Sequence, residues 1–174
     1  MVDGILKDAI ASFSDPGLYE AIVQRDYNVA GQCFLLLRVL KEALQDANVS
    51  LHIGLKPVEI LYMWSVIREL ENSADHARRI ALTITKAKIT PAHAHSIKRI
   101  LEEVYEHHQR AVAAYFSNNK KEATTVIAGK REIIEECISF SLKANKREIV
   151  EVVEELKKIE KSAVIIARTT VDME

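Results

Sequence analysis

The chain contains few of the residues that interrupt helices, with five glycines and three prolines among its 174 residues. We also predict no β-strand, the element in which apolar and polar residues alternate along a half-buried surface. Alanine, leucine, glutamate, lysine and isoleucine are abundant, and such a composition favours helix throughout. These features exclude a fold rich in β-sheet and predict an all-α protein.

Other absences limit the function and the location of the protein. Cys33 and Cys137 are isolated in apolar helical segments, without a C-x-x-C pair, so we expect two buried thiols. No signal peptide is visible, and no apolar run approaches the ~20 residues of a membrane span. The formal charge of −1 gives no general attraction to nucleic acid or to anionic lipid. The sequence therefore predicts a cytoplasmic protein with no direct nucleic-acid contact.

Motifs of catalysis are also missing. The chain has no G-x-S-x-G, no H-E-x-x-H and no glycine-rich phosphate loop. It has no E-x-x-H, which ferritin-like di-iron bundles require twice. The side chains within each of the histidine pairs 93/95 and 107/108 diverge on a helix. His76 is expected to lie at the surface or to contact a metal ligand, and not to bind a metal itself. We expect no enzyme and no histidine-based metal site.

Apolar residues at helical spacing predict six helices. Asp15-Pro16 and Thr90-Pro91 are typical of helix starts, because Asp or Thr caps the N-terminus and Pro fits the first turn. Residues 47–56 are expected to form the longest connection, because they contain Asn48, Ser50 and Gly54. The predicted helices cover residues 3–13, 16–46, 57–88, 91–116, 121–143 and 147–171.

The two halves of the chain resemble each other. Residues 21–33 align with residues 125–137, and this alignment places Cys33 over Cys137. Residues 70–77 align with residues 156–163, and the loop before the last helix is shorter in the second half. An internal repeat of this length predicts two tandem three-helix bundles, one from residues 1–89 and one from residues 90–174.

Residues 67–82 contain the best candidate for a functional site. Glu71 and Asp75 are four residues apart, so on a helix both project from one side, about one turn apart. Two carboxylates at this spacing suit a hard or borderline cation. Asp26, near the middle of the second predicted helix, is the best third ligand from another helix.

The same spacing has a second interpretation. Arg68, Arg78 and Arg79 are within reach along the same helix, and such groups commonly form a solvated salt-bridge face. Asp26 also fits an ordinary exposed acid. Spacing alone leaves a metal site and a salt-bridge face open.

The repeat and the carboxylate motif together resemble the PhoU family of phosphate uptake regulators, and archaeal members most of all. The third and sixth helices of that family carry a motif close to L-E-R-I-x-D-x-A-x-x-I-A. Arg25-Asp26, followed by Val29, resembles the acidic stretch of the family's second helix. The resemblance covers essentially the whole chain. The residues that match the motif are Leu70, Glu71, Asp75, Ala77, Ile80 and Ala81.

The chain also departs from the family pattern. Asn72 replaces the arginine of the motif, and Ala30 stands where a second acid is frequent. In the second repeat, Lys157 and Lys161 replace the metal-binding carboxylates, and an ammonium group cannot ligate a cation. We therefore expect ion pairs in place of a second metal cluster, and a metal only at Glu71, Asp75 and Asp26. The expected carboxylate partners of the two lysines are Glu132, Glu135, Glu136 and Glu160.

The resemblance implies a regulator that is not an enzyme. It implies docking onto the ATPase of the phosphate ABC transporter or onto a sensor protein, association as a homodimer, and membrane contact only through the partner. It also implies a metal of the Fe or Zn type at the first-repeat motif. Some archaeal members carry a small DNA-binding domain ahead of the PhoU part, and none is visible in this sequence. The alternative is a metal-free helical scaffold for protein association in another pathway.

Overall fold

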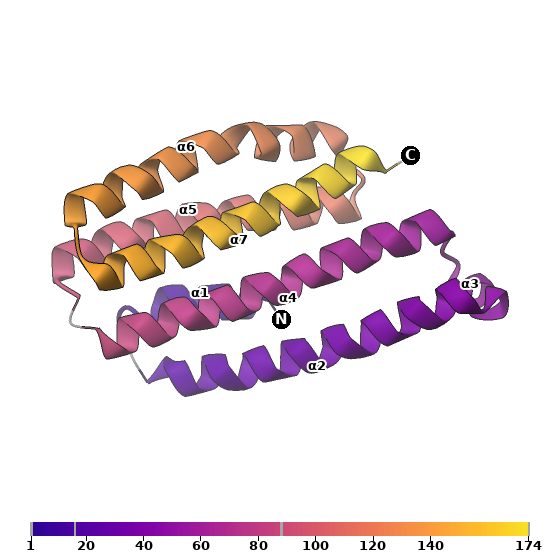
Figure 1. Ribbon diagram of the computed structural model, residues 1–174, viewed down its shortest axis with the longest axis horizontal. Helices are drawn as coiled ribbons and strands as arrows, with labels where there is room; N and C mark the ends of the chain where they lie inside the picture. Colours follow the sequence, from indigo (N-terminus) through magenta and orange to yellow (C-terminus); the bar gives the residue numbers. More distant parts are fainter. Residues whose placement is uncertain (1, 16, 88, 174) are drawn as a thin grey trace.

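The structure is a computed structural model that describes residues 2–15, 17–87 and 89–173. Within these ranges it consists of seven helices joined by short turns, without a strand (Figure 1). The all-α prediction is therefore confirmed. Pro16, the expected first helical residue, and Lys88, the expected end of a helix, lie outside the described residues. The helices are α1 (Val2–Ala11), α2 (Leu18–Gln45), α3 (Ala47–Ile53), α4 (Pro57–Lys86), α5 (Pro91–Phe116), α6 (Lys120–Ala144) and α7 (Arg147–Asp172).

The prediction of six helices is wrong because residues 47–53 form α3. Asp46 caps this helix, since its carboxylate accepts a hydrogen bond of 2.8 Å from the backbone N–H of Asn48. Gly54 ends the helix in the left-handed conformation at φ 71°, which glycine adopts without steric cost. The polar residues that suggested a loop are thus the caps and the exposed side of a seven-residue helix.

The helices form two groups of three that meet in the middle of the molecule. Helices α1, α2 and α4 pack on one another, as do α5, α6 and α7. The most extensive contact between the groups is that of α4 with α7, which lie side by side at the centre (Figure 1). Helices α2 and α6 lie on opposite outer sides. This arrangement matches the internal repeat, with α3 as an addition between the second and third helices of the first group.

One apolar core runs through both groups. Its fully buried side chains come from α1, α2, α4, α5 and α7, and Cys137 adds the contribution of α6. The core therefore crosses the predicted boundary between residues 89 and 90. A smaller cluster fills the end of the bundle where α4 begins and α7 ends. It contains Val66, Ala111, Ala114, Tyr115, Ala123, Val126, Ala163, Ile166 and Ala167.

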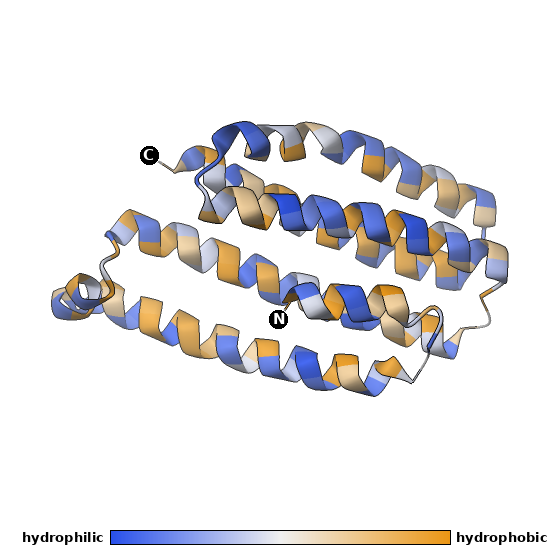
Figure 2. Ribbon diagram, turned by 180° about the vertical axis from the view of Figure 1, so that it is seen from behind, coloured by the Kyte–Doolittle hydropathy of each residue, from blue (hydrophilic) through white to orange (hydrophobic). Residues whose placement is uncertain are grey.

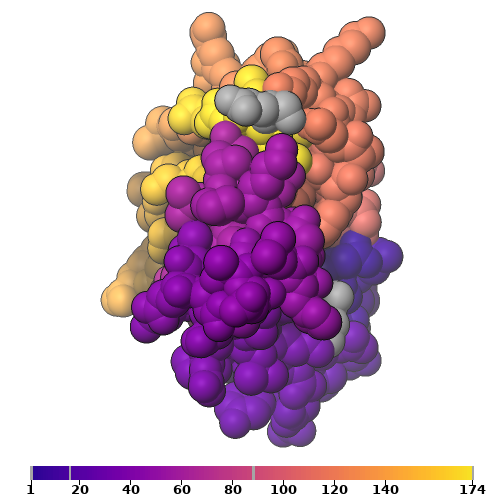
Figure 3. Space-filling view, turned by 90° about the vertical axis from the view of Figure 1, so that its right-hand side faces the viewer, coloured from indigo at the N-terminus to yellow at the C-terminus, as the bar shows by residue number. Residues whose placement is uncertain are grey.

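The end of the bundle that carries α3 is shown in Figure 3, where α2, α3 and α4 occupy the lower part of the face and α5 to α7 the upper part. The hydroxyl of Tyr62 on α4 donates a hydrogen bond of 2.7 Å to the backbone carbonyl of Asp172 on α7. This contact fixes the first turns of α4 to the last turn of α7. No described helix is long and apolar enough to cross a membrane.

Candidate functional site

Asp26 and Asp75 come together on one arginine. Asp26 lies in the middle of α2, whereas Asp75 and Arg78 lie three residues apart on α4. The Arg78 Nε donates to Asp26 Oδ2 at 2.8 Å, and its Nη2 donates to Asp75 Oδ1 at 2.6 Å. Arg79 Nη2 is 2.7 Å from Asp75 Oδ2. The two predicted ligands from different helices are thus neighbours, as the sequence suggested, and the group between them is a guanidinium.

Glu71 takes part in a separate ion pair. Its Oε2 lies 2.7 Å from Nη1 of Arg68, three residues earlier on α4. The Glu71 side chain is 30% exposed and the Arg68 side chain 51% exposed. The contact is therefore an i,i+3 pair at the surface, and such pairs stabilise a helix by about 0.2–0.5 kcal/mol.

The charge on Asp75 is favoured by its arginine neighbours. Partial burial opposes ionisation of this carboxyl, but the hydrogen bonds from Arg78 and Arg79 outweigh it and hold the pKa below its ordinary value. The hydrogen bond to Asp75 raises the pKa of Arg78 in turn. The cluster is an ion-paired network at neutral pH, held between α2 and α4.

As arranged, these residues do not fit a metal ion. Among the described residues, no three His, Cys, Asp or Glu side chains gather closely enough to hold one. All three predicted ligands are already paired with arginines. A cation between Asp26 and Asp75 would need Arg78 to leave, because two positive charges at one site repel each other.

The second repeat does not pair its lysines as expected. Lys157 Nζ lies 2.7 Å from Glu154 Oε1, three residues earlier on α7. Of the four glutamates expected to pair with Lys157 or Lys161, none does so in the described structure. Glu135 pairs with Arg131, Glu136 with Arg99 and Glu160 with His107, while Glu132 forms no ion pair with a described residue. The prediction is wrong because α5 supplies Arg99 and His107 as partners, and the sequence pattern of α6 and α7 does not contain them.

A comparison of the chain with models of protein families finds a match in the first half of the chain. Residues 1–84 match the family model of the PhoU domain. Similarity to the PhoU family is therefore shown for these residues. The match includes α1, α2, α3 and most of α4, and therefore contains Asp26, Glu71, Asp75 and Arg78. Neither a curated protein nor a solved structure matches the chain.

The PhoU domain is joined to the second half by two equivalent polar contacts that sequence reasoning did not find. His76 Nδ1 on α4 lies 2.6 Å from Glu155 Oε2 on α7. Ser162 Oγ on α7 donates to Glu69 Oε2 on α4 at 2.7 Å. In the repeat alignment His76 corresponds to Ser162 and Glu69 to Glu155, so the two contacts are related by the same pseudo-symmetry as the two halves. His76 is therefore an interhelical contact and not a surface group.

A buried pair in the second half was also missed. Glu160 is fully buried, and its carboxylate lies 2.8 and 3.0 Å from Nδ1 of His107 on α5. A Cβ atom added to Gly129 of α6 would lie 2.9 Å from Nε2 of the same histidine. Three helices thus meet at His107, and glycine provides the space for its ring. In the sequence, the feature that could have indicated this buried pair was the glycine at position 129, which leaves space for a large side chain.

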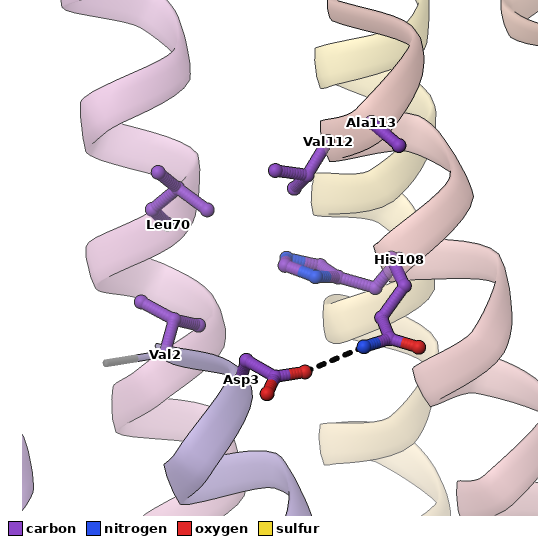
Figure 4. A pocket seen from close by; sticks show the side chains of 7 residues that line it. Val2, Asp3, Leu70, His108, Val112 and Ala113 are labelled. Atoms are coloured by element: carbon purple, nitrogen blue, oxygen red, sulfur yellow. Dashed lines mark hydrogen bonds between the residues drawn. The ribbon is translucent and has the colours of Figure 1, made fainter. Parts of the chain in front are cut away.

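The PhoU domain and α5 enclose a cavity of about 360 Å³. Figure 4 shows the His108 ring pointing from α5 into this cavity, towards Leu70 of α4 and Val2 of α1. His108 is 3% exposed, and its Nε2 has no hydrogen-bond partner among the described residues. Burial lowers the pKa of His108 to about 4, so the ring is neutral at pH 7. At the mouth of the cavity Gln109 donates to Asp3 at 2.6 Å.

Proposed function

We propose that the chain regulates phosphate uptake as a cytoplasmic PhoU-type adaptor that docks onto the ATPase subunit of a phosphate ABC transporter. The observation that carries this proposal is the PhoU domain of residues 1–84, because this family consists of phosphate-transport regulators that are not enzymes. Docking between folded proteins needs an exposed surface with apolar side chains. The helical bundle offers one on α2.

Seven large apolar side chains of α2 are exposed, and we call five of them the α2 outer face. They are Val23, Tyr27, Phe34, Leu35 and Val39, with exposed fractions from 39% to 76%. Figure 2 shows the corresponding apolar segments along the middle of α2. At about 100° per residue, Tyr27 and Phe34 lie on the side of the helix opposite to the buried Val29. The core of this chain therefore does not explain the α2 outer face.

This surface supports docking for an energetic reason. Phe34 and Leu35 leave most of their apolar area in water, and covering a side chain of this size contributes about 1.5–3 kcal/mol. Aromatic residues at the centre of an interface commonly dominate its affinity. Phe34 also has the Arg38 guanidinium 5.9 Å above its ring, which adds a charged group beside the apolar centre.

A purified transporter ATPase subunit tests the proposal in a pull-down with the full chain. We expect binding by the wild type and at least a tenfold loss with Phe34→Glu. The matched control is Leu142→Glu on α6, since Leu142 is 75% exposed on the opposite side of the molecule. The proposal is overturned if the wild type fails to bind at any phosphate concentration, or if both variants lose binding equally.

A homodimer and a metal are separate parts of the proposal. Sedimentation of the wild type and of Phe34→Glu distinguishes self-association through the α2 outer face from binding to a different partner. Metal analysis of the purified chain, with Glu71→Ala and Asp75→Ala together as the comparison, tests for an Fe or Zn ion. If self-association is found without metal and without binding to the transporter, the metal-free scaffold is the better description.

A further inference from the structure

The charges of the candidate site are inverted in the second half of the chain. The repeat alignment places a lysine at the position of each of the three carboxylates that the sequence offers as metal ligands. The related residues are Asp26 and Lys130, Glu71 and Lys157, and Asp75 and Lys161. We call Lys130, Lys157 and Lys161 the lysine cluster. Three negative charges on α2 and α4 are thus replaced by three positive charges on α6 and α7.

Contacts within the structure follow the same register. The two equivalent polar contacts between α4 and α7 relate these helices as the alignment does. Burial is the main cause of the raised pKa of Cys33 on α2 and of Cys137 on α6. The next cause at Cys33 is the negative charge of Glu71. At Cys137 it is the positive charge of Lys157, which acts in the opposite direction. Lys157 therefore has the place beside one cysteine that Glu71 has beside the other.

The first half neutralises its carboxylates with an arginine that the second half lacks. Arg78 donates to Asp26 at 2.8 Å and to Asp75 at 2.6 Å, so one guanidinium holds two acids from different helices. The residue related to Arg78 is Val164, which is buried with 2% exposure. Because valine carries no charge, the side chain at this position does not balance the charges around it.

The lysine cluster consequently carries unbalanced positive charge. Lys157 pairs with Glu154, which is 51% exposed, and a surface pair of this kind contributes little. Lys130 is half-buried and Lys161 is exposed, and neither forms an ion pair with a described residue. These two lysines stand at positions equivalent to two acids that reach one guanidinium. Ammonium groups at such positions repel one another, and an anion between them removes this repulsion.

We propose that the lysine cluster binds a phosphate group, to which ammonium groups from α6 and α7 donate hydrogen bonds. A phosphate group suits the cluster because it carries up to two negative charges and at least three acceptor oxygens on one atom. Ammonium groups that approach from two helices can therefore all donate to it. The group is either free inorganic phosphate or a phosphomonoester on another molecule, since both present the same oxygens. The site lies on α6 and α7, away from the α2 outer face (Figure 1).

Phosphorus NMR of the full chain tests the proposal, with inorganic phosphate and glycerol phosphate as the two probes at constant ionic strength. We expect saturable broadening of the resonance of at least one probe. Lys130→Gln and Lys161→Gln should each weaken binding at least fivefold, because each removes one of three charges. The matched control is Lys143→Gln, because Lys143 is exposed on the same helix as Lys130 and about 20 Å further along it. It should bind as the wild type does.

Thermal unfolding provides a second measurement on the same proteins. Lys130→Gln and Lys161→Gln remove charges without a partner, so they should not lower Tm in phosphate-free buffer. Saturating phosphate should raise the Tm of the wild type and of Lys143→Gln more than that of either cluster variant. A cluster variant with a lower Tm in phosphate-free buffer would overturn the proposal, because the lysine would then stabilise the fold itself.

Absence of saturable binding of both probes overturns the proposal, and so does equal weakening by Lys161→Gln and Lys143→Gln. Tighter binding of inorganic phosphate supports the free ion as the ligand, and tighter binding of glycerol phosphate supports a phosphate group carried by a larger molecule. The proposal rests on the inverted charges and not on docking to the transporter. Phosphate binding can therefore hold where the pull-down with Phe34→Glu fails, and the reverse.

Discussion

Nδ1 of His76 lies 2.6 Å from Oε2 of Glu155, across the contact between α4 and α7. On its own helix, Glu155 also accepts a hydrogen bond of 2.7 Å from Lys158. Glu69, the counterpart of Glu155, likewise accepts from Asn72 on its own helix and from Ser162 on the other. Each half of the chain thus contributes one glutamate, Glu69 or Glu155, which contacts a side chain of the other half.

Loss of Glu155 is expected to destabilise the protein. Its side chain is 14% exposed, so Glu155→Ala leaves His76 and Lys158 without a partner in a half-buried place. We expect a decrease of about 1–3 kcal/mol in the free energy of unfolding, measured by urea denaturation. Glu154→Ala is the control, since Glu154 makes the same i,i+3 pair with Lys157 but is 51% exposed, and about 0.5 kcal/mol or less is expected there. Equal losses would contradict a structural role of the interhelical contact.

Arg78 is expected to exclude cations from the site between α2 and α4. Arg78→Gln removes the charge that neutralises Asp26 and Asp75 and should lower the free energy of unfolding by about 1–3 kcal/mol. Calorimetric titration with Zn²⁺ should then show tighter binding to Arg78→Gln than to the wild type. Arg68→Gln is the control, because Arg68 pairs only with the exposed Glu71. Tighter Zn²⁺ binding by the wild type than by Arg78→Gln would show that Arg78 does not exclude cations from the site between Asp26 and Asp75.

The buried His108 is expected to make stability fall in mild acid. Burial lowers the pKa of this ring from 6.5 to about 4, and Asp3 opposes this shift only in part. Between these two pH values the unfolded chain binds a proton that the folded chain does not, so stability decreases as pH falls through this window. The contribution between pH 7 and pH 5 is about 2 kcal/mol.

Urea denaturation at both pH values measures this effect. Between pH 7 and pH 5, the free energy of unfolding of His108→Leu should decrease by about 2 kcal/mol less than that of the wild type. His95→Gln, at an exposed position of the same helix, should follow the wild type. A His108→Leu variant with unchanged pH dependence would contradict a neutral buried ring.

Two glycines within helices predict opposite effects of one substitution. Gly129→Ala would place a Cβ atom 2.9 Å from the ring of His107, which Glu160 holds in place, so a loss of about 1–3 kcal/mol is expected. Gly31→Ala meets no atom within 4 Å on the exposed side of α2, and a gain of about 0.5–1 kcal/mol is expected. Thermal unfolding of both variants measures the difference. A stabilising Gly129→Ala would mean that His107 is free to move.

Several features could be predicted from the sequence for physical reasons. Helix boundaries follow from local caps and apolar spacing. Over the described residues, all six predicted helices therefore agree with the structure to within a few residues. The expectation of two buried thiols at Cys33 and Cys137 is confirmed. Helix α3 was missed because its apolar residues Val49, Leu51 and Ile53 are two residues apart and not at helical spacing, so that only its caps distinguish it from a loop.

The candidate site shows the limit of sequence reasoning. The spacing of Glu71 and Asp75 predicted that both project from one side of α4, and it left both a metal site and a salt-bridge face open. The position of Asp26 relative to Asp75 depends on how α2 is rotated and crossed against α4, which local spacing does not contain. Arg78 joins Asp26 and Asp75 because that packing brings the Asp26 carboxylate of α2 within 2.8 Å of the Arg78 guanidinium.

By itself, the sequence determined the helical class and the resemblance to PhoU, because these depend on composition, periodicity and local motifs. The tandem repeat stays a prediction. Only the tertiary structure decided which charges neutralise one another and that Glu160 is buried against His107. These features depend on contacts between residues far apart in the chain, where a rotation of one helix by a single residue changes every partner.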